Sequence, residues 1–509
     1  MALKKKSIFQ ETNIVKRMKD RNRPVRALMN GVATIRNQIT NKNNETEPTI
    51  VEYIPKEERE SKKAYENRLL RTYVTPYLKN AVTTATGQIF KNPIQIRPEN
   101  EALPEQVNDL IKNVDMEGTD LNEFCMKATE ESLAYGMSIA YVDYANPSKS
   151  DNRGEQMQSG ARPYVKLVTY YDLLGYSFDQ YGRITMLRFL EEAILEDEEY
   201  GVETAQRVKV VTPTGYKIYD QDEKGEDYLV EQGKIQRFVD GKLIKDYVPA
   251  VVLYGRKLGT LNAASVFEDL AYINLQHTQV NSDLSWSAHF YLIPFLFTIM
   301  GEDGDTEEFS KNFSLLASNI NVTLPKDSDI KWVETNGKAQ EAGQSLLNSI
   351  EEKIDISKMD STVSVTSGAK ETATGRALQA DSSSAKLKLH AEAIESFAKS
   401  IIEMMASFTI YKLPSFDVLA NKEFNAKFND SVFKTTTDMV SNNQLTLKTM
   451  LSEAQRRGDI SDDIDIDKEV EELMKTGKKE DEPDIITQDN NIELEEEEYD
   501  ELEQQITVL

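Results

Sequence analysis

The sequence has few of the residues on which disulfides and metal sites depend. Its 509 residues include one cysteine and three histidines. A single cysteine excludes an internal disulfide framework, and Cys125 lies in an apolar helical pattern that predicts a small buried side chain. His277, His289 and His390 are too scattered along the chain to predict a metal centre. We therefore expect no metal and no cofactor.

The sequence also lacks a long apolar run. Its most apolar stretch, residues 290–300, is far shorter than the roughly 20 residues of a membrane-spanning helix, and Pro294 interrupts it. The basic start is not followed by an apolar segment, so no signal peptide is predicted. Hydrophobic residues make up 39% of the chain, charged residues 29%, and the net charge is -26. This balance favours a protein with large polar surfaces in a reducing, aqueous compartment, without a membrane partner.

Short catalytic motifs are missing as well. The sequence has no G-x-x-x-x-G-K-[ST] loop, no G-x-G-x-x-G and no G-x-S-x-G. Asp463, Asp465 and Asp467 have the spacing of the start of a calcium loop, but Lys468 stands where that loop needs glycine. Carboxylates are plentiful, yet no pair stands out for acid–base catalysis. We therefore expect a protein that is not an enzyme.

The charges that are present are unevenly placed. Residues 1–42 carry eleven Lys or Arg and two acids, whereas residues 480–509 carry thirteen acids and no Lys or Arg. A basic arm can bind nucleic acid or an acidic protein surface, and it can equally be a solvated, disordered tail. The acidic end predicts a disordered, self-repelling tail.

Apolar periodicity predicts helices in the first third of the chain. Residues 64–90 have helical spacing, which Pro76 should interrupt. Asp120 is placed to cap a helix that should end at Gly136, and a strand should follow at 137–142.

Residues 163–256 predict a β-rich part, because short apolar runs alternate with turn signals. The strongest hairpin signal is residues 237–244, where Asp240 and Gly241 suit the positive-φ positions of a type I′ turn.

Helical patterns return afterwards. Helices are expected from about 263, at 338–358 and at 376–411, before Pro414. The longest has an apolar stripe formed by Leu378, Ala385, Leu389, Ala393, Phe397, Ile401 and Met404. Further strands are expected at 320–324, 330–333, 424–428 and 432–433, and further helices at 437–453 and 467–476. Because helices and strands are segregated, the sequence predicts the α+β class.

Several motifs, together with this order of elements over residues 50–475, resemble the portal proteins of tailed double-stranded DNA bacteriophages, which are head-to-tail connector rings. The motifs are Tyr53-Ile54-Pro55, Tyr65-Glu66-Asn67-Arg68-Leu69, Gly87-Gln88-Ile89-Phe90-Lys91-Asn92-Pro93, Asp115-Met116-Glu117-Gly118, Leu133-Ala134-Tyr135-Gly136, Tyr141-Val142-Asp143, Arg162-Pro163-Tyr164 and Arg457-Gly458-Asp459-Ile460-Ser461. The long basic arm and the acidic tail depart from the family.

The resemblance implies a portal architecture with wing, stem helices, a small α/β clip, a tunnel loop with a long helix, and a helical crown. The implied parts are a basic N-terminal arm (1–42), the wing (43–262, β-rich over 163–256), the first stem helix (263–290), the clip (291–335), the second stem helix (338–358), the tunnel loop (360–376), the long helix (377–412), C-terminal wing strands and crown (413–479), and the acidic disordered tail (480–509).

Two sets of site residues follow from the resemblance. The tunnel loop would face DNA with small, mobile side chains, although it could also be an ordinary surface loop. Its residues would be Ser361, Thr362, Ser364, Thr366, Ser367, Lys370, Thr372, Thr374 and Arg376. The apolar face of the second stem helix would pack on a neighbouring subunit, or else within its own subunit. That face is Ala339, Ala342, Leu346, Ile350 and Ile354.

The implied function is a ring homo-oligomer, a dodecamer, that forms the channel for genome packaging and ejection at one capsid vertex. Its partners would be the major capsid protein, the terminase large subunit, head-completion adaptor or tail proteins, and double-stranded DNA without sequence specificity. It would be made in the host cytoplasm and reside in the virion. A net charge of -26 would let a DNA backbone slide by repulsion. The alternatives are another virion protein, such as a minor capsid or head-completion protein, and a motif-poor intracellular hydrolase.

Overall fold

The computed structural model of this chain describes residues 7–33, 35, 48–99, 102–145, 161–198, 201–222, 224–239, 241–291, 295–299, 329–333, 338–358, 373–409, 413–422, 424, 437–442, 445–456, 466 and 468–470. The chain divides into two compact units, Met1–Asn425 and Ala426–Leu509. Both helices and antiparallel strands are abundant, so the α+β class is confirmed.

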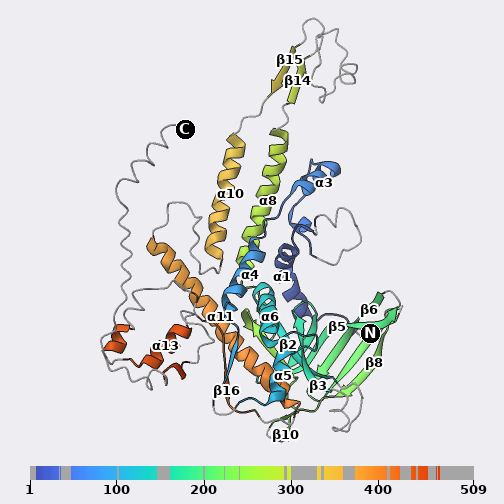
Figure 1. The fold of residues 1–509 in the computed structure, drawn as a ribbon. Helices are drawn as coiled ribbons and strands as arrows, with labels where there is room; N and C mark the ends of the chain where they lie inside the picture. The colour runs from blue at the N-terminus through green and yellow to red at the C-terminus, as the bar shows by residue number, and fades with distance from the viewer. Residues whose placement is uncertain are drawn as a thin grey trace. The chain divides into compact units, whose positions relative to one another are not determined.

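The helices of the larger unit are α1 (Asn13–Asn30), the short 3-10 helix η1 (Ile50–Tyr53), α3 (Lys62–Arg71), α4 (Tyr77–Ile89), α5 (Glu105–Lys112), α6 (Leu121–Tyr135), α8 (Glu268–Tyr291), α10 (Lys338–Ser357) and α11 (Ala373–Ser407). In the smaller unit α13 spans Leu447–Arg456. Within the larger unit, α8 contacts α1, α3, α4 and α10, and Figure 1 shows α8 and α10 running side by side.

The strands of the larger unit form two sheets and several pairs, all antiparallel. One sheet has the order β11 (Ala250–Tyr254), β2 (Met137–Ala145), β3 (Arg162–Thr169). The other is a meander of β4 (Leu173–Phe178), β5 (Ile184–Glu198), β6 (Gly201–Thr212), β7 (Gly215–Gln221) and β8 (Asp227–Lys234). The pairs are β1 (Gln95–Pro98) with β16 (Phe416–Leu419), β9 (Phe238–Val239) with β10 (Lys242–Leu243), β12 (Arg256–Gly259) with β13 (Asn262–Ala264), and β14 (Phe295–Ile299) with β15 (Asp329–Val333).

Several predicted boundaries are confirmed and have clear local causes. The break expected at Pro76 separates α3 from α4. The Asp120 carboxylate accepts a hydrogen bond from the Glu123 N–H, which caps α6. Gly136 ends α6 with φ +97°, and a Cβ there would lie 2.5 Å from the Ala264 backbone. Glycine is therefore required both by the left-handed backbone and by the close approach of a second segment.

The hairpin predicted over 237–244 is present as β9 and β10, and Gly241 has φ +72°. Asp240 lies outside the described residues, as do the strands expected at 320–324 and 432–433. The strand expected at 330–333 is β15, which pairs with β14.

Other boundaries were predicted wrongly. The helix expected from about 263 begins at Glu268, because 262–264 is instead β13, paired with β12. The long helix begins at Ala373, so Thr374 and Arg376 lie in α11 and not in a loop. β16 was not predicted, because the strand with which it pairs, β1, lies more than 300 residues earlier in the chain.

The apolar stripe predicted for the long helix is correct only in its second half. Phe397 and Ile401 are buried, but Leu389 is 68% exposed and Ala385 is exposed. The first half of the buried stripe is formed by Leu387, Ala391 and Ile394. Small and apolar residues are frequent on both sides of this helix, so periodicity alone did not fix which side faces the core.

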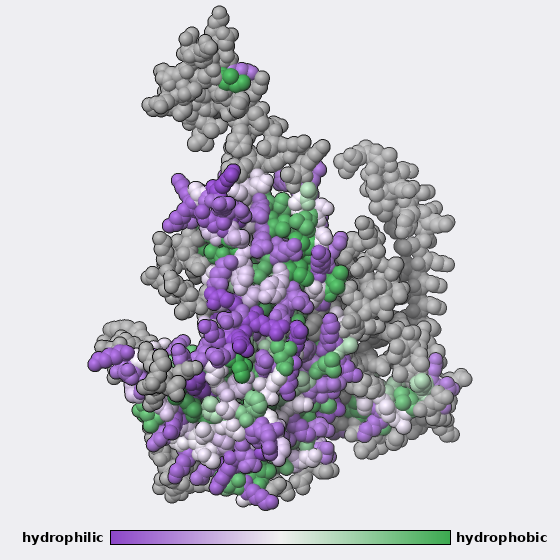
Figure 2. All heavy atoms as spheres, turned by 180° about the vertical axis from the view of Figure 1, so that it is seen from behind, coloured by the Kyte–Doolittle hydropathy of each residue, from purple (hydrophilic) through white to green (hydrophobic). Residues whose placement is uncertain are grey.

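One hydrophobic core joins residues from α1 through α11 to β16. It includes Cys125, which is fully buried as predicted, and burial raises the pKa of its thiol. On the face drawn in Figure 2, hydrophobic patches lie between more numerous hydrophilic side chains.

Candidate functional site

The segment that follows the β-rich part is organised around α8. This helix is unusual because buried polar side chains line one side of it, among them Asn274, Thr278 and Ser282. The Asn274 side chain accepts a hydrogen bond from the Leu78 N–H at 3.2 Å and donates one to the Thr75 carbonyl at 3.1 Å. It thus supplies partners to the backbone groups that the break between α3 and α4 leaves without helical partners.

Two more bonds continue this contact towards the end of α8. Ser282 and Thr72 share a hydrogen bond of 2.8 Å between their hydroxyls, and the Asn281 amide donates to the Tyr73 carbonyl at 3.2 Å. The polar side of α8 therefore positions α3 and α4 through directed bonds, where an apolar stripe would allow sliding.

Arg68 fixes α3 to the segment that precedes it in the chain. Its guanidinium is almost fully buried, donates to both Glu60 carboxylate oxygens at 3.0 and 2.9 Å, and donates to the Pro55 carbonyl at 2.6 Å. A longer contact of 3.4 Å reaches Asp283 of α8. In addition, the Tyr65 hydroxyl donates to the Ile54 carbonyl at 2.6 Å. Two of the motifs that carry the portal resemblance, residues 53–55 and 65–69, thus lie in direct contact.

A single carboxylate joins three helices. Glu351 of α10 accepts a hydrogen bond from the Tyr77 hydroxyl of α4 at 3.2 Å and lies 3.2 Å from Nε2 of His277 of α8. The Tyr77 and His277 rings meet edge to face, with centroids 5.1 Å apart. Burial, followed by the negative charge of Glu351, raises the pKa of Tyr77 to about 12. The tyrosine therefore acts as a neutral donor over the physiological pH range.

The apolar face of α10 differs from the predicted one. Leu347, Ile350 and Ile354 are buried within the chain, while Leu346 is 48% exposed. Gly343 leaves room for the Leu284 side chain of α8, since a Cβ at Gly343 would be 2.4 Å from that side chain.

Ile350 and Ile354 therefore pack within their own subunit and are not free to contact a neighbour. Ala342 and Leu346 are exposed, and the side chain of Ala339 lies outside the description. Because Leu346 and Leu347 are adjacent, the sequence did not show which of them belongs to the buried face. In the structure Leu347 is the buried one.

Most of the predicted tunnel-loop residues cannot be placed. Ser361, Thr362, Ser364, Thr366, Ser367, Lys370 and Thr372 lie outside the described residues. Thr374 and Arg376 belong to the backbone of α11, and their side chains are not described.

The basic N-terminal arm is a helix over residues 13–30, so a disordered tail is the wrong interpretation for this part. Val15, Val25 and Leu28 of α1 are buried in the core. Arg21 forms a bidentate ion pair with Glu268 of α8 at 2.6 and 2.7 Å, and Arg23 forms one with Glu52. These two arginines therefore bind the protein's own carboxylates, whereas Lys16 and Arg17 of the same helix are exposed.

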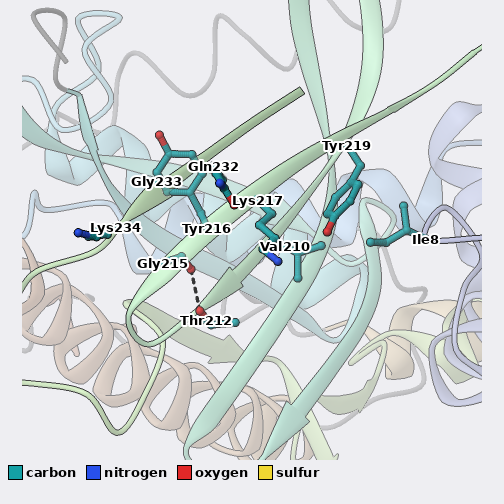
Figure 3. Close-up of a pocket in the computed structure, with 10 residues that line it drawn as sticks. All are labelled: Ile8, Val210, Thr212, Gly215, Tyr216, Lys217, Tyr219, Gln232, Gly233 and Lys234. Atoms are coloured by element: carbon teal, nitrogen blue, oxygen red, sulfur yellow. Dashed lines mark hydrogen bonds between the residues drawn. The ribbon is translucent and has the colours of Figure 1, made fainter. Parts of the chain in front are cut away.

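A shallow depression of about 580 Å³ lies over β6, β7 and β8, beside Ile8 (Figure 3). Its walls carry Tyr216, Tyr219, Lys217 and Gln232, but none of the ten lining residues is His, Cys, Asp or Glu. In the described parts of the chain, no group of three or more His, Cys, Asp or Glu is arranged to hold a metal ion. Among those same residues, no helix is both long and apolar enough to cross a membrane.

Comparison with known proteins identifies one matching family model. It is described as a domain of unknown function (DUF4055), and it matches residues 266–409. This range begins just before α8 and ends just after α11, so it covers α8, the β14–β15 pair, α10 and α11. No curated protein matches the chain.

Proposed function

We propose that this protein is one subunit of a ring-shaped portal, the channel through which double-stranded DNA enters and leaves a bacteriophage capsid. The observation that carries the proposal is the succession of α8, the β14–β15 pair, α10 and the 35-residue α11. Two long helices that pack on each other, with a paired β segment between them, suit a stem and clip. The motif resemblance in residues 53–164 supports the same assignment independently.

In this proposal β-rich residues 163–256 belong to the wing, α8 and α10 are the stem helices, and β14–β15 belongs to the clip. The tunnel loop would occupy residues 360–372, before α11 begins at Ala373, and α13 would belong to the crown. The partners would be the major capsid protein, the terminase large subunit and adaptor or tail proteins.

The directed bonds along α8 suit a subunit that must keep its shape in a ring. A head-to-tail contact closes into a ring only if the angle between neighbours is fixed. Asn274, Ser282 and Glu351 fix α8 against α3, α4 and α10. The net charge of -26 supports passage of DNA without tight binding, because carboxylates do not replace the counterions of a phosphate backbone.

Negative-stain microscopy and mass photometry of the purified full chain test the proposal. We expect rings with an axial hole and a particle mass near that of twelve chains. Compact particles with no axial channel would overturn it.

A pair of leucine variants tests which surface assembles. Leu346 on α10 and Leu229 on β8 have similar exposure, 48% and 45%. Leu346→Asp should reduce ring formation because it places a charge on the exposed side of the proposed stem, whereas Leu229→Asp should leave rings intact. Equal behaviour of the two variants would contradict the stem interface.

A further inference from the structure

The two β-sheets of the larger unit are joined by a buried cluster of charged groups that the proposed function does not use. Lys209 of β6 and Asp143 of β2 are 4% and 7% exposed, although they are ionisable. The Lys209 amine donates to Oδ2 of Asp143, across 66 positions of sequence. Because β2 and β6 belong to different sheets, this contact crosses from one sheet to the other.

The two oxygens of the Asp143 carboxyl have different surroundings. Oδ1 accepts hydrogen bonds from the Tyr141 hydroxyl at 3.1 Å and from the Tyr144 N–H at 2.9 Å. Oδ2 accepts from the Tyr164 hydroxyl at 3.1 Å and contacts the Lys209 amine. A hydroxyl and a backbone N–H on one oxygen are the donors that stabilise an oxyanion when a carbonyl carbon is attacked.

A second carboxylate completes the cluster. Oε1 of Glu191 accepts from Lys166 at 2.7 Å. Its buried Oε2 accepts no hydrogen bond from the described residues and lies 3.7 Å from the Lys209 amine. That oxygen is placed to take a proton from the amine and return it to a leaving oxygen. The amine also lies over the rings of Tyr141 and Tyr216, at 5.5 and 4.9 Å from their centroids, so aromatic groups help to exclude water.

We propose that Lys209 and Asp143 react to form an intramolecular isopeptide bond, with Glu191 as the proton-transferring group. The Lys209 Nζ–Asp143 Cγ bond forms, and the bond from Cγ to Oδ2 breaks. Glu191 carries two protons in turn from Nζ to Oδ2, which leaves as water, while Oδ1 remains as the amide oxygen. One ammonium and one carboxylate become one neutral amide and one water, so no oxidant or co-reactant is needed.

The buried environment favours the amide product over a permanent ion pair. Burial lowers the pKa of Lys209, but Asp143 and Glu191 outweigh it and raise the pKa overall, so the amine starts as an ammonium and must first lose a proton. Two buried charges keep their desolvation cost, whereas a neutral amide held by Tyr141 and Tyr144 does not. The released water molecule gains translational entropy when it enters the solvent.

Intact mass spectrometry of the denatured full chain tests the proposal directly. The wild-type chain should be lighter than its sequence by one water molecule, and proteolysis should release a branched peptide that joins residues 143 and 209. A folded wild-type chain with the full sequence mass would show that the contact stays ionic and would overturn the proposal.

Variants identify the source of the water loss. Asp240 precedes Gly241, and such a pair can also lose water by closing to a succinimide. Lys209→Arg keeps the positive charge but removes the reactive amine, so this variant should have the full sequence mass. A water loss that persists in Lys209→Arg would overturn the proposal, and the wild-type peptide map decides the question if this variant does not fold.

Glu191→Gln tests the proton transfer. Glutamine keeps the shape of the side chain and can still accept a bond from Lys166, but it cannot carry the proton. The cross-linked fraction should fall at least about tenfold after a fixed time, within the range that general acid–base catalysis contributes. Formation at the wild-type rate would overturn the role of Glu191.

Discussion

The ionic contacts of α1 and those between the two β-sheets use the same residue types in opposite environments. Arg21 and Glu268 meet near the surface, where the arginine side chain is 39% exposed, and water can replace either partner. Lys209, Asp143 and Glu191 meet where the lysine and aspartate side chains are 5% and 9% exposed. The same kind of ion pair can therefore be dispensable at a surface and indispensable between two sheets, because the free-energy cost of losing one partner grows with burial.

The largest expected effect comes from removing the Lys209 amine, because its loss abolishes both the buried positive charge and any amide bond formed with Asp143. Lys209→Met leaves Asp143 and Glu191 together without a positive partner between them. We expect a loss of about 3–5 kcal/mol in the free energy of unfolding, measured by urea denaturation. Lys217→Met, on an exposed position of β7, is the matched control and should change the unfolding free energy by less than about 0.5 kcal/mol. Equal losses of unfolding free energy in the two variants would contradict the expectation that burial makes Lys209 more important than Lys217.

A second prediction concerns a carboxyl group that burial keeps protonated. Burial, reinforced by Asp172 and opposed by Arg26, raises the pKa of Glu131 to about 8. A raised pKa means that this group stabilises the fold fully below pH 4.5 and loses that contribution as the pH rises through 8. Glu131→Gln stays neutral at every pH, so above pH 8 it should be more stable than wild type by several kcal/mol, because each pKa unit between 4.5 and 8 corresponds to about 1.4 kcal/mol.

Thermal unfolding of wild type and Glu131→Gln between pH 5 and pH 9 measures this difference. The gain should be near zero at pH 5 and grow with pH. Glu130→Gln is the control at the neighbouring position and should show no such trend. A gain that does not depend on pH would exclude titration of Glu131 as its cause.

A smaller effect is expected at the junction of α4, α8 and α10. Glu351→Ala removes the acceptor shared by Tyr77 and His277, whose Nδ1 already lacks a hydrogen bond among the described residues. The side chain of Glu351 is 42% exposed, so water can replace part of the contact, and we expect a loss of about 1–2 kcal/mol. Chemical denaturation should separate this variant from Glu352→Ala, an exposed neighbour with no expected effect.

The smallest effect is expected on α1. Arg21→Ala breaks the bidentate pair with Glu268 but should cost less than about 1 kcal/mol, and the cost should shrink further in 1 M salt. Arg17→Ala, exposed on the same helix, is the control. If 1 M salt does not reduce the loss of unfolding free energy in Arg21→Ala, the Arg21–Glu268 pair behaves as a buried contact and not as a surface one.

Features set by neighbouring residues could be predicted from the sequence. The cap at Asp120, the turn at Gly241 and the break at Pro76 depend on the backbone preferences of a few adjacent residues. The ends of α10 were predicted to within one residue, because its apolar side chains recur at helical spacing.

Features that depend on distant partners could not be predicted. The basic residues of α1 gave no sign that Glu52 and Glu268 would neutralise them, and Lys209 gave none that it would meet Asp143. A charged residue in a strand is ordinarily assigned to the solvent face, and only the packing of two sheets placed this one inside.

Local residue patterns alone established the α+β class and the approximate places of several helices and strands, because these follow from backbone preferences and from the period of apolar side chains. Only the tertiary structure decided that Leu347 and not Leu346 faces α8, that α1 binds the protein's own acids, and that Lys209 lies between two carboxylates. The physical reason is that burial and charge pairing depend on which distant surfaces meet, and a local pattern carries no information about its partner.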